Sequence, residues 1–488
     1  MSSPAEDRSH GPFLVAGATA LLLALYFLLD GRPPRDPGLY WADVPRMSRA
    51  LGGHRWDMMS PILARPGGWL VVVLAGISRV ARGVWVFEAV SLISVTALVA
   101  SAGRLGAWIA RSSGPDGARW GGWVGALMVA GMPLVVVQGR LPWIHLPEAA
   151  LLGLLLVILV EDPRLERRGA GLAAVLLGAA LASVRHSGLV WLITTLPLLR
   201  GRAWFLVLPW AVGAVPSVLE LWPYLMSKAG ARANYASLLP GLPRQILWLV
   251  GAPGLAVLVL GLVGRWRHHR WDRTATAVMG MLGTVAAMWL TFRAGLDNFT
   301  PMALALVILA AGGVGRAATG IAGLGMIWVW GSTFVPGFET DSRSLYRVSP
   351  AHEVGLIREL VDRSCVHQPC RVGVVSGLFQ PHGEEPGHLE LWTLGMDGIF
   401  IIDLRNGARV LAEVPVAAVA QWDCGESERA WLERFPRSDE WRDYGRRALG
   451  LRPAWVYRPD NQCAFVWWTK DGALMGAEPS VGRRPQRR

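Results

Sequence analysis

The sequence predicts an α-helical polytopic membrane domain of about eleven spans, followed by a small extracytoplasmic α/β domain. Apolar stretches recur between Pro12 and Pro336, at about the 20 residues needed to cross a hydrocarbon core about 30 Å thick. After Pro336 the sequence becomes polar. All four cysteines lie in that polar tail, and disulfides persist in oxidising compartments.

We therefore divide the chain at the points where its composition changes. The expected parts are a cytoplasmic N-terminus at 1–11, a membrane domain at 12–336 with a long first external loop at 30–83, an extracytoplasmic α/β domain at 337–480, and a disordered basic tail at 481–488. The first span, Phe13–Leu29, is interpreted as a retained signal-anchor, because only Arg8 precedes it and a small-residue cleavage site is poor. The further spans predicted are 84–102, 121–138, 144–160, 170–184, 187–199, 203–219, 246–264, 275–291, 299–315 and 317–335.

Arginines in the short connections predict the orientation, since cytoplasmic loops are enriched in Arg and Lys. The clearest loop is Gly264–Arg273, and three others carry Arg104, Arg111 and Arg119; Arg164, Arg167 and Arg168; and Arg200 and Arg202. These loops fall on one side when the N-terminus is cytoplasmic, and eleven spans then leave the C-terminal domain outside. A bacterial inner membrane fits this topology, and a eukaryotic endoplasmic reticulum satisfies it equally.

The four cysteines permit three pairings, of which we favour Cys365 with Cys370 and Cys424 with Cys463. A zinc site wants CxxC-like spacing, which neither pair supplies well, and free structural thiols are the third alternative. The net charge of +12 rests almost entirely on arginine, with Lys228 and Lys470 the only lysines. These arginines are scattered rather than gathered with aromatics, which argues against nucleic acid and favours anionic membrane lipids as partners.

The charged, Trp-containing segment Asp30–Arg82 separates the first span from the next good one. It begins with an acidic residue soon after a span, Asp43, and leads through Arg65-Pro-Gly-Gly-Trp69 into an apolar stretch. Such a loop suggests short interfacial helices and a reaction site at the membrane surface. Two motifs follow downstream, Ala180-Leu-Ala-Ser-Val-Arg-His-Ser-Gly188 and Phe292-Arg-Ala-Gly-Leu-Asp-Asn-Phe-Thr-Pro301.

In the order and spacing of these motifs the chain resembles the membrane glycosyltransferases of the GT-C superfold, in particular the protein-mannosyltransferase and aminoarabinose-transferase-like group. The likeness covers roughly residues 10–340. Many relatives have Asp-Glu where this chain has Asp43-Val44, and Lys-Pro-Pro where it has Arg65-Pro-Gly. The missing second acid leaves the number of catalytic carboxylates open.

The resemblance implies transfer of a sugar from a polyprenyl-phosphate donor to an acceptor hydroxyl at the outer face of the membrane. Asp43 is the candidate base, which would take the acceptor proton, and Asp57 is the second choice in the same loop. The alternative role for Asp43 is to cap a loop helix in which Pro45 stands at an early position.

Fixed cations would stabilise the leaving phosphate, and arginine suits phosphate through its bidentate fork. The candidates on the predicted outer side are Arg293, Arg185, His186, Lys228 and Arg232. Snorkelling to lipid head groups is the alternative for Arg185 and Arg293. His145 and Glu148, at another outer span start, are candidates for the acceptor side. A Trp anchor at the interface with incidental polar neighbours is the alternative there.

The tail reads as a capped helix near 349–361, strands at 371–376, 399–402, 416–422 and 464–468, and a largely helical segment at 426–449. Two other functions stay open: a lipid-linked saccharide transporter or flippase, and a noncatalytic scaffold that presents the tail to a partner. No internal repeat of spans is evident, whereas many transporters have one. No motif indicates a cofactor. The sugar, the acceptor, the polyprenyl length and any divalent-metal requirement are left open.

Overall fold

The computed structural model describes most of the predicted membrane domain and the core of the C-terminal domain. The described residues are 10–30, 43–80, 85–140, 144–229, 242–267, 280, 283, 300–311, 315–334, 351–365, 370–375, 399–403, 417–424, 452–457 and 463–469. The chain divides into two compact units. The first comprises Met1–Gly31, Ser60–Leu70 and Phe87–Val348, and the second comprises Arg32–Met59, Val71–Val86 and Ser349–Arg488.

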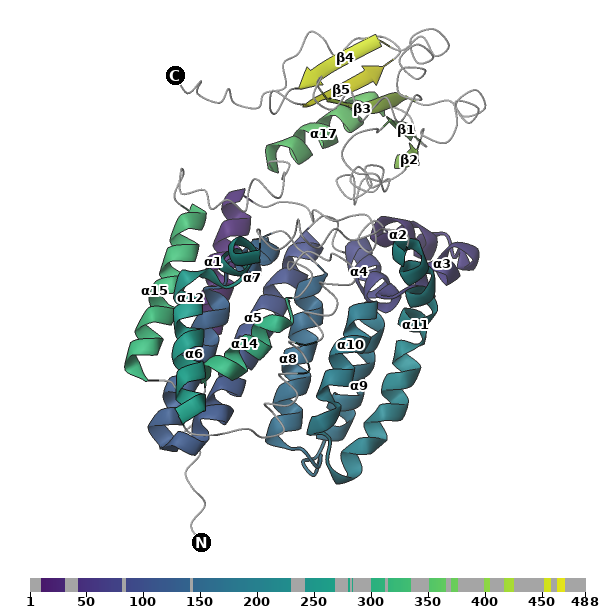
Figure 1. The fold of residues 1–488 in the computed structure, drawn as a ribbon. Coiled ribbons are helices and arrows are strands. Elements are labelled where there is room, and N and C mark those ends of the chain that lie inside the picture. Colours follow the sequence, from purple (N-terminus) through teal and green to yellow (C-terminus); the bar gives the residue numbers. More distant parts are fainter. Residues whose placement is uncertain are drawn as a thin grey trace, which may run out of the picture. The chain divides into compact units, whose positions relative to one another are not determined.

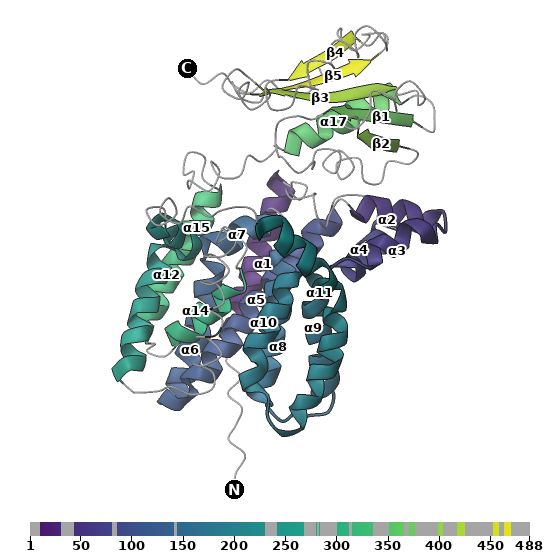
Figure 2. The same cartoon turned by 45° about the vertical axis from the view of Figure 1, so that its right-hand side comes forward.

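The first unit is a bundle of helices (Figures 1 and 2). Its helices are α1 (Gly11–Asp30), α5 (Trp85–Ala110), α6 (Gly114–Ala130), α7 (Pro133–Arg140), α8 (His145–Glu161), α9 (Ala170–Val184), α10 (His186–Thr195), α11 (Val207–Ala229), α12 (Leu242–Arg267), α14 (Met302–Ala310) and α15 (Arg316–Phe334). Short 3₁₀ turns stand at Arg111–Ser113, Leu196–Leu198 and Gly201–Leu206.

Apolar side chains lie on both the inside and the outside of this bundle. Its core joins residues of nearly every helix, among them the fully buried Leu98, Leu152 and Trp191. Large apolar side chains are also exposed, for example Leu21 on α1 and Leu208 on α11. An outward apolar surface of this kind is stable in lipid and not in water.

Within the described residues three helices are long and apolar enough to cross a membrane, or four if one bent pair counts as a single span. The three segments are Gly11–Leu28, Trp85–Ala110 and Gly201–Leu219. The chain is therefore a multi-pass membrane protein, but the predicted count of eleven spans is not reached in the described part. Residues 275–291, predicted to form another span, lie almost wholly outside the described residues.

The span predicted at 121–138 is not one continuous helix, because the chain forms two helices there. α6 and α7 meet at an angle of 54°. Pro133 begins α7 and has no backbone N–H to continue the hydrogen bonds of α6. Gly131, at the bend, lies so close to the backbone of α15 that a Cβ would be 2.7 Å from the nitrogen of Met326. Close packing against α15 thus accompanies the break.

The predicted span at 299–315 is too long, since α14 has only nine residues and all of them are buried. A hydropathy pattern records a preference for apolar surroundings, and protein neighbours supply these as well as lipid does. The span predicted at 84–102 is too short, because α5 continues to Ala110. α12 also exceeds its predicted limits of 246–264, and its backbone leaves helical geometry at Gly251.

The first loop contains the short helices predicted for it. They are α2 (Asp43–Gly52), α3 (Trp56–Leu63) and α4 (Gly68–Val80). Arg79 of α4 donates a hydrogen bond of 2.8 Å from Nη1 to the backbone carbonyl of Ser48 in α2. This contact ties α4 to the helix that Asp43 begins.

The C-terminal part of the second unit is an α/β fold, as predicted. The strands are β1 (Cys370–Val375), β2 (Ile399–Asp403), β3 (Ala418–Cys424), β4 (Arg452–Tyr457) and β5 (Cys463–Thr469), in the sheet order β2-β1-β3-β5-β4. β1 pairs in parallel with β2 and β3, while β5 is antiparallel to β3 and β4. The sequence did not predict β4, and the helical prediction for 426–449 lies outside the described residues.

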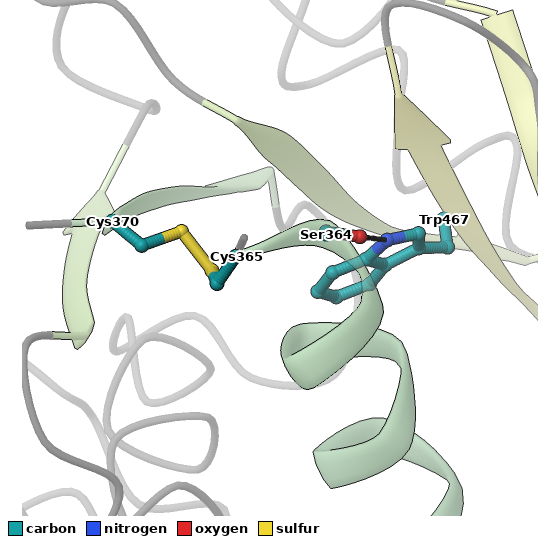
Figure 3. The surroundings of a disulfide bond; sticks show 4 residues. All are labelled: Ser364, Cys365, Cys370 and Trp467. Atoms are coloured by element: carbon teal, nitrogen blue, oxygen red, sulfur yellow. Dashed lines mark hydrogen bonds between the residues drawn. A yellow bond between two sulfur atoms is a disulfide. The ribbon is translucent and has the colours of Figure 1, made fainter. Parts of the chain in front are cut away.

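Helix α17 (Ala351–Ser364) is joined to this sheet by two links (Figure 3). A disulfide connects Cys365 and Cys370, whose Cα atoms are 5.4 Å apart, which confirms the first predicted pair. The indole of Trp467 donates a hydrogen bond of 2.9 Å to Ser364 Oγ. The backbone register of β3 and β5 places Cys424 opposite Cys463, and their pairing stays a prediction.

Candidate active site

The first turn of α8 carries two buried polar residues, His145 and Glu148. They stand three residues apart and so share one face of the helix. His145 Nδ1 lies 3.7 Å from Glu148 Oε2. Both residues belong to the sequence-predicted site, and both are almost completely shielded from solvent.

The break between α9 and α10 brings a cation to this pair. α9 ends at Val184, and Arg185 is extended (φ −165°, ψ 156°) before α10 begins at His186. The chain turns back closely here, since a Cβ on Gly188 would lie 1.9 Å from the carbonyl oxygen of Leu181. Only a glycine allows that approach.

The residues of the two helix starts make direct contacts. Arg185 Nη1 lies 2.6 Å from His145 Nδ1 and 3.2 Å from Nε2. Ser187 Oγ donates a hydrogen bond of 2.5 Å to Glu148 Oε1. The fully buried Trp191 is a further neighbour of the Glu148 carboxyl. We call these five residues the α8–α10 cluster.

Arg185 determines the role of His145 in this cluster. A guanidinium has only donors, so the ring nitrogen that pairs with it must act as an acceptor and carry no proton. The cluster offers one cation next to a buried carboxylate, an arrangement that can orient a polar ligand.

A turn of the first loop lies against the same helix break. The backbone N–H of Gly67 donates a hydrogen bond of 2.6 Å to the carbonyl oxygen of Ser183, near the end of α9. Gly67 has φ +77°, a conformation that favours glycine. The Arg65–Trp69 motif and the Ala180–Gly188 motif thus meet in space. They begin 115 residues apart in the sequence.

The two candidate bases lie in different surroundings. Asp43 is the first residue of α2 and is buried, with Arg46 Nη1 at 3.5 Å from its Oδ1. Asp57, in the first turn of α3, is exposed and is held by both nitrogens of a forked Arg55, at 3.0 and 2.8 Å. The hydrogen bond and the charge of Asp57 raise the pKa of Arg55. Asp43 is thus the first helical residue of α2, and its capping role stays a prediction.

The remaining sequence candidates are not brought into the cluster by any described contact. Arg293 and Arg232 lie outside the described residues, as do the side chains of Lys228, in the last turn of α11, and His186. Sequence reasoning missed Ser187, Trp191 and a buried pair in which Thr300 donates to Gln138 Oε1. Gln138 could have been identified from the sequence, since it is a polar residue in an otherwise apolar run. Within the described residues no group of three or more His, Cys, Asp or Glu side chains could hold a metal ion.

The fold and the cluster define a multi-pass membrane protein whose polar residues meet at one end of a helical bundle. No family model matches the chain, and no curated protein matches it. The chain is similar in fold to ArnT from Cupriavidus metallidurans in the apo state. The TM-score is 0.54 at 14% identity, over 96% of this chain and 98% of that one.

The same protein bound to undecaprenyl phosphate gives a TM-score of 0.52 at 14% identity, over 96% of this chain and all of that one. The likeness covers both the membrane and the C-terminal parts. At this identity it shows a shared fold. The expected resemblance to the aminoarabinose-transferase-like group is thus confirmed, as a remote one.

Proposed function

We propose that this protein is an integral-membrane glycosyltransferase that moves a sugar from a polyprenyl-phosphate donor to an acceptor hydroxyl. The observation that carries the proposal is the fold shared over 96% of the chain with ArnT, which has been solved with undecaprenyl phosphate bound. The buried carboxylate and cation of the α8–α10 cluster add support. Ionisable residues inside membrane domains are costly and usually functional.

In the proposed reaction the acceptor hydroxyl gives its proton to Asp43, and its oxygen bonds to the anomeric carbon of the sugar. The bond between that carbon and the phosphate oxygen breaks, and its electron pair leaves with the polyprenyl phosphate. A positioned base contributes about 10²–10⁴-fold to such a step. Arg185, near His145 and Glu148, is proposed to hold a polar group of the donor or acceptor.

We further propose that the reaction takes place on the outer face of a bacterial inner membrane. The arginines between α8 and α9, such as Arg164 and Arg167, follow the end of α8 opposite to His145. The positive-inside tendency puts that end in the cytoplasm and the α8–α10 cluster at the outer face. The N-terminus is then cytoplasmic and the α/β domain extracytoplasmic.

The test is sugar transfer by the purified protein in lipid, with a panel of radiolabelled polyprenyl-phosphate sugars and an envelope extract as the source of acceptors. We expect Asp43→Asn to lower turnover by about 10²–10⁴-fold. Asp57→Asn is the matched control, because it removes an exposed carboxylate of the same loop that already pairs with Arg55. It should keep most of the activity.

Each variant is checked for unchanged thermal unfolding, so that lost turnover is not confused with lost structure. Loss of activity in Asp57→Asn and not in Asp43→Asn would move the base to Asp57. A wild type that turns over no donor, but carries lipid-linked saccharide across vesicles, would replace the proposal by the transporter function. A wild type that does neither would favour the scaffold.

A further inference from the structure

Tyr26 of α1 and Arg140 of α7 form a pair outside the α8–α10 cluster. The Cζ atom of Arg140 lies 4.4 Å from the centroid of the Tyr26 ring. Its Nη2 also donates a hydrogen bond of 3.3 Å to the Tyr26 hydroxyl. The guanidinium thus lies on a nearly buried aromatic face, an arrangement that stabilises and orients a cation.

The end of α7 that carries Arg140 is fixed on two sides. Ser91 of α5 donates a hydrogen bond of 2.6 Å to the carbonyl oxygen of Gly139. The neighbouring Gln138 accepts a hydrogen bond from Thr300, and both residues are fully buried. Arg140 therefore projects from a rigid helix end rather than from a loose connection.

The guanidinium of Arg140 has more donors than partners. Among the described residues it contacts Tyr26, and no carboxylate lies within the 4.0 Å of an ion pair. Its Nε is buried and has no hydrogen-bond acceptor in the described part of the chain. A guanidinium offers five N–H donors, and leaving a buried donor without an acceptor is costly. A bound anion would provide both the charge and the acceptors.

Snorkelling does not account for this arrangement. A snorkelling arginine carries its charged head to the water or the lipid head groups and buries only its stem. Here the head is partly buried against Tyr26, and the Nε at its base is completely buried. The geometry of Arg140 is typical of a side chain preorganised to bind a ligand and not of one that anchors the helix to lipid head groups.

Arg140 also lies at the same end of the bundle as the α8–α10 cluster. α7 ends at Arg140 and α8 begins at His145, so their Cα atoms are at most about 18 Å apart. His145 in turn contacts Arg185. Arg140 and Arg185 are thus both linked to the start of α8, the first by a short connection of the chain and the second by direct contact.

Resting on the proposed function, we propose that Arg140, aligned by Tyr26, is a further binding residue for the phosphate group of the lipid-linked donor. Arginine suits this role because it stays charged and presents parallel N–H groups to phosphate oxygens. The donor phosphate bears the charge that develops as the sugar leaves. A cation at this place would also hold the polyprenyl phosphate after transfer.

The test measures binding of undecaprenyl phosphate to the full-length protein in phosphatidylcholine nanodiscs. Arg140→Gln should weaken binding by about 10- to 100-fold, the value of one or two charge-assisted hydrogen bonds. Arg140→Lys keeps the positive charge but loses the parallel N–H groups, so its affinity should fall between those of the wild type and Arg140→Gln. Tyr26→Leu removes the aligning ring and should weaken binding by about tenfold at most.

Arg316→Gln is the matched control. Arg316, at the start of α15, also lies over an aromatic ring, with its Cζ 5.7 Å from the centroid of Trp120. Trp120 stands in the first half of α6, away from α7 and Arg140. The control removes the same charge and the same kind of stacking, and should leave binding within about twofold of the wild type.

Unchanged binding in a folded Arg140→Gln variant would overturn the inference and leave the proposed function intact. An equal loss of phosphatidylglycerol binding in the same variant would show a general site for lipid head groups and would also overturn it. A wild type that binds no polyprenyl phosphate would remove the donor from the proposed function, and the inference with it. Thermal unfolding of each variant separates these results from misfolding.

Discussion

The backbone N–H of Gly67 donates a hydrogen bond to the carbonyl oxygen of Ser183, with 2.6 Å between nitrogen and oxygen. This bond joins the Arg65–Trp69 turn to the last residues of α9, directly before the extended Arg185. The turn therefore fixes the helix break from which Arg185 reaches His145. A substitution in the turn should therefore change the positions of the residues of the α8–α10 cluster.

Gly67→Ala should destabilise the protein, because the φ of +77° is unfavourable for a residue with a Cβ. The expected cost is roughly 1–2 kcal/mol in the free energy of unfolding, measured by denaturant titration in detergent. Gly17→Ala is the control, since Gly17 lies in α1 with open space around it. Alanine there should be neutral or should stabilise by about 0.5–1 kcal/mol. Equal effects at the two positions would contradict the role of the turn.

Ser187→Ala should lower the free energy of unfolding by more than Ser183→Ala does, although the two serines flank the same helix break. Ser187 Oγ donates to the fully buried Glu148, and its loss leaves a buried carboxyl oxygen without that donor. The expected cost is about 1–3 kcal/mol. Ser183 Oγ bonds only to the carbonyl of Ala180 in its own helix. Its removal should cost about 0.5 kcal/mol or less in the same unfolding measurement.

Asp162 should make the stability of the bundle depend on acid pH. Burial by itself raises the pKa of this carboxyl. The backbone N–H groups of Arg167 and Glu166, at 2.7 and 3.0 Å, outweigh that effect and hold the pKa below its ordinary value of 3.8. A lowered folded-state pKa gives stability that is present above about pH 4 and is lost as the pH falls through the folded pKa.

Asp162→Asn should therefore be less stable than the wild type at pH 7, and the difference should shrink as unfolding is measured down to pH 3. Glu166→Gln is the control. Its carboxylate is largely exposed and forms only a 3.7 Å pair with Arg164. Exposed pairs contribute about 0–1 kcal/mol, so this variant should show little change at any pH. A constant difference for Asp162→Asn across the range would refute the lowered pKa.

Cys424 and Cys463 should form a disulfide when the α/β domain folds in an oxidising compartment. Their Cα atoms are register partners across β3 and β5. Closing this loop of about 40 residues would stabilise the domain by roughly 4 kcal/mol, against roughly 2 kcal/mol for the short loop between Cys365 and Cys370. Mass spectrometry of peptides alkylated without reduction tests this. Alkylated Cys424 and Cys463 would contradict both the pairing and the proposed outer location.

The local pattern was enough to predict several elements and one covalent bond. The apolar run at 13–29 became α1, the Cys365–Cys370 spacing became a disulfide, and the capped motif near Pro350 became α17. Each depends on residues close together in the chain. The site was predicted only as a set of residue types, and Ser187, Trp191 and Arg140 were missed because their partners come from other helices.

The predicted spans were in error for the same reason, because a local sequence pattern does not record contacts between distant helices. Hydropathy predicted apolar segments at 121–138 and 299–315 but did not reveal the bend before Pro133 or the fully protein-enclosed α14. A residue that faces lipid and one that faces another helix have the same apolar character. Only their neighbours in space distinguish them.

The sequence by itself determined that this chain is a multi-pass membrane protein with a polar α/β tail, because segment length and composition dictate which helices tolerate lipid. Its motifs also indicated the fold group. Only the tertiary structure decided that Arg185 meets His145, that Gly67 meets Ser183, and that Arg140 lies on Tyr26. Such contacts depend on how helix ends pack across the bundle, and no local pattern of residues records that packing.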